Sequence, residues 1–155
     1  LLAALLRWSR RLPHSRRDRA WLRAVYRHGA SLIAPRTLDE LARFRAMATL
    51  TSSAEEVTYR LAVPGGIALL WAAIAGGGAA AAAWPAAALS ALLFGVAHSW
   101  QGGAVMAWTT VFGLVAAALT LHSGSVWPAI ALHVGWNLIV GGMMHTVYRR
   151  RGLTS

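Results

Sequence analysis

The stretch from Leu61 to Tyr148 contains no Asp, Glu, Lys or Arg. A helix that crosses a bilayer needs about 20 predominantly apolar residues, so this stretch has room for roughly four such helices. The alternation of apolar and polar residues that marks a membrane barrel is not seen in it. The sequence therefore predicts an all-α fold, a multi-span integral membrane helical bundle with about four core transmembrane helices.

Charged residues are confined to the two sides of this stretch. All five acidic residues lie before residue 57, and the fifteen basic residues, all arginines, lie at or before Arg60 or in the run 149–151. Arginines that flank apolar helices mark the cytoplasmic side of a membrane, so we expect both ends of the core in the cytoplasm. The net charge of +10 also fits nucleic acid binding, but the position of the arginines favours anionic lipid headgroups. We expect a lipid bilayer as partner and no nucleic acid.

The composition predicts three parts. Residues 1–50 form an Arg-rich segment, residues 51–148 the transmembrane core, and residues 149–155 a basic cytoplasmic tail. Segments 20–33 and 38–49 could be amphipathic helices at the membrane surface or an ordinary solvated linker. The chain begins with Leu rather than Met, so we expect it to be part of a longer chain whose earlier span ends in the first residues.

Glycine-rich and polar turns divide the core into expected helices. The first is expected to begin at Ser52 or Ser53, with a disturbance at the Pro-Gly-Gly run. The four expected ranges are 52–75, 84–99, 104–121 and 126–145.

The first polar cluster of the core is Glu55, Glu56 and Arg60. Glu56 and Arg60 are four residues apart, the spacing at which a helix pairs opposite charges. Glu55 then points about 100° away from that pair. The alternative is structural, because Ser52 and Glu55 have the spacing of a capping box at a helix start.

Two further clusters lie deeper in the apolar stretch. Phe94 and His98 end one expected helix, while His133 and Asn137 share a face of another. Polar side chains within a membrane are costly and are functional candidates by default. For His98 taken alone, the alternative is an interfacial histidine or a hydrogen bond between helices. For His133 and Asn137 it is hydrogen bonding between helices.

Taken together, these clusters resemble the motifs of the CPBP family of intramembrane proteases, the Rce1-like type II CAAX prenyl endopeptidases, also called the Abi family. The motifs read Glu-Glu-x-x-x-Arg, Phe-x-x-x-His and His-x-x-x-Asn, and the resemblance covers about residues 53–139. It implies an endopeptidase, expected in a bacterial cell membrane, that cuts a peptide or protein substrate, such as a prenylated CAAX-type protein. The alternatives are a non-catalytic scaffold or bacteriocin-immunity protein of the same fold, and a small transporter or channel subunit.

The resemblance also implies a role for each residue. Glu55 would act as general base, with His98 helping to hold and polarise the attacking water. His133 and Asn137 would donate hydrogen bonds to the developing oxyanion. Glu56, Arg60 and Phe94, the other residues of the motifs, are expected to support these residues.

The same residues leave the question of a metal open. Glu55, His98 and His133 are a possible zinc ligand set with a position for water. The usual zinc protease signature, two histidines one helical turn apart with an adjacent Glu, is not found in the sequence. The sequence slightly favours a glutamate mechanism without a tightly bound metal.

Overall fold

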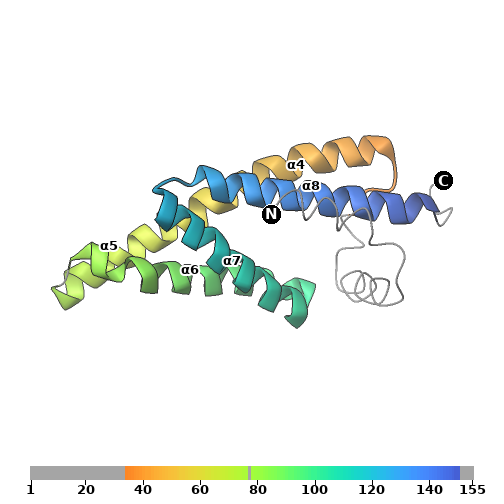
Figure 1. The fold of residues 1–155 in the computed structure, drawn as a ribbon. Helices are drawn as coiled ribbons and strands as arrows, with labels where there is room; N and C mark the ends of the chain where they lie inside the picture. Colours follow the sequence, from red (N-terminus) through yellow and green to blue (C-terminus); the bar gives the residue numbers. More distant parts are fainter. Residues whose placement is uncertain (1–33, 77, 151–155) are drawn as a thin grey trace. The chain divides into compact units, whose positions relative to one another are not determined.

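The computed structural model describes residues 34–76 and 78–150, and within them every regular element is a helix (Figure 1). The prediction of an all-α fold is thereby confirmed. The predicted helix at 20–33 and the end of an earlier span fall outside the described residues. The long helices are α4 (Leu38–Val57), α5 (Val63–Ala75), α6 (Ala83–Ala97), α7 (Gly103–Ser123) and α8 (Trp127–Arg150).

The first helix begins earlier than the sequence analysis expected. Thr37 is its N-cap: the hydroxyl of Thr37 accepts from the amide of Glu40, and the Glu40 carboxylate accepts from the amides of Arg36 and Thr37. This is a reciprocal capping box. Ser52 and Glu55 lie inside α4 instead, so the prediction of a helix start at Ser52 and the capping alternative for Glu55 are both wrong.

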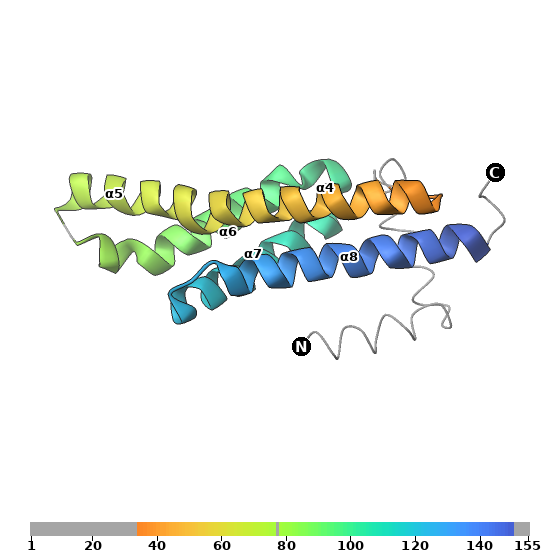
Figure 2. The same ribbon diagram turned by 90° about the horizontal axis from the view of Figure 1, so that it is seen from above.

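A π-turn joins α4 to α5, and the three segments run on as one helix (Figure 2). In this turn, Thr58–Ala62, the amide of Val63 donates to the carbonyl of Thr58, five residues back. Pro64 follows directly, and a proline inside a helix has no N–H and clashes with the preceding turn. The expected disturbance at Pro64 is therefore present, displaced by one turn because proline acts on the residues before it.

The described residues form two compact units. Residues 34–52 and 132–150 belong to the first unit, and residues 53–76 and 78–131 belong to the second unit. The expected three-part division of the chain by composition stays a prediction.

In the second unit, α6 packs along α7 through small side chains. Ala91 on α6 is fully buried, and Gly113 on α7 lies directly against it. A Cβ on Gly113 would crowd the Ala91 side chain. A Cβ on Gly95 would overlap the Thr110 hydroxyl oxygen. Small residues allow this close approach, which is the usual way in which helices associate within a membrane.

In the first unit, the N-terminal part of α4 and α8 run antiparallel. The side-chain amide of Asn137 donates to the Ser52 hydroxyl at 2.8 Å. Two helical turns earlier on α4, the ring of Phe44 fills the space in front of Gly141, where a Cβ would overlap it.

Glycines end the helices at the expected turns. Gly76, Gly102 and Gly124 all have positive φ values, between 65° and 100°, a conformation that other residues rarely adopt. The second and third expected helices agree with α6 and α7 to within about two residues, whereas α8 continues five residues beyond its expected end at 145.

Three helical stretches of the described residues are long and apolar enough to cross a membrane: Leu38–Ala75, Ala80–Ala97 and Gly103–Ser123. Their large apolar side chains point outward, as at Ile74, which is 78% exposed in the isolated chain, and lipid would cover them. The chain is an integral membrane protein. The remaining long helix, α8, carries the more polar residues His133, Asn137 and His145. The cytoplasmic position of both ends stays a prediction.

Candidate active site

The acidic cluster of the second unit contains a fully buried ion pair. Arg60 Nε donates to Glu56 Oε2 at 2.7 Å, and Arg60 Nη2 donates to Oε1 at 3.2 Å. Glu56 is 0% exposed and Arg60 is 5% exposed. The pair predicted from the four-residue spacing is thus present, with the two-pronged geometry that arginine makes with a carboxylate. Glu55 directly precedes Glu56 and is half-buried.

Phe94 of α6 lies at the centre of the aromatic contacts around this pair. Its ring lies 5.0 Å from the guanidinium carbon of Arg60 and 5.1 Å from the ring of Tyr59, which it meets edge-on. The ring of His98 meets the Phe94 ring edge-on, with the ring centroids 4.6 Å apart. The 1% exposure of Phe94 keeps the guanidinium against an aromatic face, a favourable contact for a cation.

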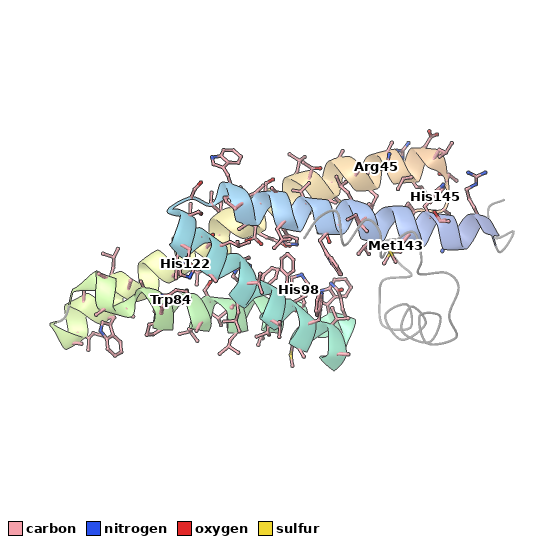
Figure 3. The ribbon with its side chains drawn as sticks, viewed as in Figure 1. Arg45, Trp84, His98, His122, Met143 and His145 are labelled. Atoms are coloured by element: carbon pink, nitrogen blue, oxygen red, sulfur yellow. The ribbon has the colours of Figure 1, made fainter. Side chains whose placement is uncertain are left out.

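The contact of His98 with the backbone determines its tautomer. Nδ1 lies 2.8 Å from the carbonyl oxygen of Phe94. A carbonyl can only accept, so Nδ1 carries the hydrogen, and a neutral ring then has its lone pair on Nε2. His98 ends α6 and is half-buried; Figure 3 shows it at this end of the helix. Nε2 can therefore accept a hydrogen bond from a water.

The remaining site candidates belong to the first unit. His133 is buried on α8, and Asn137, one turn later, makes the 2.8 Å bond to Ser52. An amide nitrogen carries two hydrogens, and the Ser52 bond uses one of them.

The structure therefore gathers Glu56, Arg60, Phe94 and His98 in the second unit, with Glu55 beside Glu56 on the same helix. The roles predicted for these residues stay predictions. The ring of His122 on α7 meets Trp84 edge-on at 5.5 Å (Figure 3).

Sequence reasoning gave Ser90 no role and gave Ser52 only a role in helix capping. Ser52 receives the Asn137 bond, and the Ser90 hydroxyl donates to the carbonyl of Tyr59 at 2.6 Å. A signal for Ser90 was available, because Ser90, Phe94 and His98 are spaced four residues apart and so follow one face of α6.

The candidate metal ligands are Glu55, His98 and His133. Within the described part of the chain, neither unit taken alone holds three His, Asp or Glu side chains placed to share a metal ion. Glu55, His98 and His133 are donors of the kinds that zinc accepts. They come from both units, so the zinc site stays a prediction.

Comparison with known proteins connects these residues to a family. The model of the family described as type II CAAX prenyl endopeptidase Rce1-like matches residues 37–139. The match begins at the N-cap of α4 and includes all three motifs. Comparisons with curated proteins and with solved structures found no match. Since the family model matches well over half of the chain, the chain belongs to the Rce1-like family of type II CAAX prenyl endopeptidases, which are proteases.

Proposed function

We propose that this protein is an intramembrane endopeptidase that hydrolyses a peptide bond of a membrane-associated protein, with prenylated CAAX-type chains as the substrate class. The observation that supports it best is the buried Glu56–Arg60 pair against Phe94 and His98. Two of the family's motifs thus fold onto each other in one unit. A bundle that needed only packing would be expected to fill this position with apolar side chains.

In the proposed reaction Glu55 is the general base. Its carboxylate takes a proton from a water, and the water oxygen bonds to the carbonyl carbon of the substrate. The C–N bond then breaks, and the proton held by Glu55 passes to the leaving amine. Glu56 does not compete for this role because both of its oxygens accept from Arg60.

His98 holds the attacking water. With Nδ1 donating to the Phe94 carbonyl, Nε2 accepts a hydrogen bond from the water and turns its oxygen lone pair toward the substrate. The edge-on contact with Phe94 limits rotation of the imidazole, so the ring is oriented before substrate binds.

The proposed oxyanion donors are His133 and Asn137, and their role rests on family membership. Asn137 keeps a second amide hydrogen beside the one that binds Ser52, and this hydrogen would donate to the negative oxygen. If zinc is bound, Glu55, His98 and His133 would hold it, and it would supply Lewis acidity at the carbonyl oxygen.

The test is cleavage by the purified protein in lipid nanodiscs, with a farnesylated CAAX peptide and the same peptide without the lipid. We expect cleavage of the farnesylated peptide and much slower cleavage of the other. Equal cleavage of both would contradict the substrate class. No cleavage of either, or of proteins from the native membrane, would favour a non-catalytic scaffold or immunity protein.

A further inference from the structure

The carbonyl of Tyr59 loses its helical donors at the π-turn. In an α-helix it would accept from the amide of Val63, but that amide donates to Thr58. In the π register the next donor would come from residue 64, which is Pro64 and has no N–H. A buried carbonyl without a donor is costly, and more so within a membrane.

Two side chains take the place of the missing amides. The Ser90 hydroxyl donates to the Tyr59 oxygen at 2.6 Å, and Arg60 Nη1 approaches the same oxygen at 3.4 Å. Ser90 is 0% exposed and comes from α6, a different helix, so its bond ties the π-turn to α6.

The Ser90–Tyr59 bond joins α6, which carries His98, to the helix that carries Glu55. On α6, Ser90 precedes Phe94 by one turn and His98 by two. On the helix that contains the π-turn, Arg60 donates both to the Tyr59 carbonyl and to Glu56. Glu56 directly follows Glu55 in the chain. A π-turn contains one extra residue, so a change to the α register would rotate one flank against the other by about 100°.

We infer that Ser90 is a positioning residue that fixes the π-turn on α6 and thereby orients the Glu55–Glu56 pair relative to His98. Its hydroxyl acts through the Tyr59 carbonyl and not on the substrate itself. The catalytic consequence rests on the proposed function, whereas the contact itself does not.

The first measurement detects the Ser90–Tyr59 hydrogen bond and does not depend on a cleavage assay. The chain has three tyrosines, so carbonyl-¹³C tyrosine labelling gives three backbone signals in solid-state NMR, and Tyr59→Phe identifies the one from Tyr59. We expect Ser90→Ala to move this signal upfield, as for a carbonyl that loses a donor. The control Thr120→Val removes a buried hydroxyl that bonds within its own helix and should leave the signal in place.

The second measurement tests the effect of the Ser90 bond on the cleavage rate. Ser90→Ala should lower kcat about tenfold to a hundredfold with KM little changed, the effect of a misplaced catalytic group. Adding Pro64→Ala supplies an N–H five residues after Tyr59, where the π register can use it. We expect Pro64→Ala/Ser90→Ala to recover much of the lost kcat and to return the Tyr59 signal downfield.

An unmoved Tyr59 signal in Ser90→Ala would overturn the inference, and so would a moved signal with unchanged kcat. Absence of recovery in the double variant would show that Ser90 acts by packing, which also overturns it. If the wild-type protein cleaves nothing, the proposed function fails, while the NMR signal still decides whether Ser90 holds the turn.

Discussion

Arg60 binds both carboxylate oxygens of Glu56, at 2.7 Å and 3.2 Å, inside the second unit and almost completely away from solvent. The same guanidinium lies over the ring of Phe94. Glu56 and Arg60 therefore form a structural ion pair next to the proposed base rather than a second base.

Breaking this pair should destabilise the protein strongly. Glu56→Gln leaves the Arg60 charge buried without its partner, and we expect a loss of about 3–5 kcal/mol in the free energy of unfolding. Glu56→Leu/Arg60→Leu removes both charges and should be more stable than Glu56→Gln. Unfolding in mixed detergent micelles measures both, with the exposed Asp39→Asn as control. A Glu56→Gln variant as stable as the wild type would show that the pair is not required.

Gly95 should not tolerate a side chain. Its missing Cβ leaves room for Thr110 and for the Met106 carbonyl, which a Cβ would approach to 2.9 Å. Gly95→Ala must push α6 away from α7, and overpacking of this kind costs about 1–3 kcal/mol. The matched control is Gly66→Ala, because a Cβ there meets nothing within 4 Å. Equal thermal unfolding midpoints for the two variants would contradict the tight α6–α7 contact.

His98 should be needed for catalysis and His122 should not. His98→Ala removes the Nε2 acceptor for the attacking water, and we expect cleavage to fall about 10²–10⁴-fold, the contribution typical of acid–base groups. His122→Ala removes a histidine whose ring contacts the exposed Trp84, and the rate should not change. Initial rates in nanodiscs decide this, and a comparable loss in both variants would argue against a specific role for His98.

Asn137 and Ser52 should be energetically coupled. Asn137→Ala removes the proposed oxyanion donor, and kcat should fall about 10²–10³-fold. Ser52→Ala removes only the bond that orients the amide, so its loss should be smaller. In a double-mutant cycle on kcat the two losses should not add, with a coupling of about 0.5–3 kcal/mol. Strict additivity would mean that Ser52 does not orient Asn137.

The sequence predicted the parts of the fold that depend on local rules. The uncharged stretch predicted a membrane bundle because charges are excluded from apolar helices, and glycines such as Gly76 and Gly124 marked the turns because only they accept positive φ readily. The Glu56–Arg60 pair followed from the four-residue spacing within one helix.

The errors and omissions come from contacts between distant residues. Ser52 and Glu55 have the spacing of a capping box, but Thr37 and Glu40 have it too and form the real one. Ser52 instead meets Asn137, 85 residues away, and Ser90 meets Tyr59, 31 residues away. Spacing along one helix does not show which residue of another helix will lie opposite.

The most direct test of the proposed mechanism is the cleavage rate of Glu55→Gln in lipid nanodiscs, measured beside Asp39→Asn. Glutamine keeps the size of Glu55 but cannot take a proton from water. We expect Glu55→Gln to fold with wild-type stability and to lose cleavage by about 10²–10⁴-fold, while Asp39→Asn, on the exposed first turn of α4, cleaves at the wild-type rate. A Glu55→Gln protein that cleaves the farnesylated peptide as fast as the wild type would contradict the account.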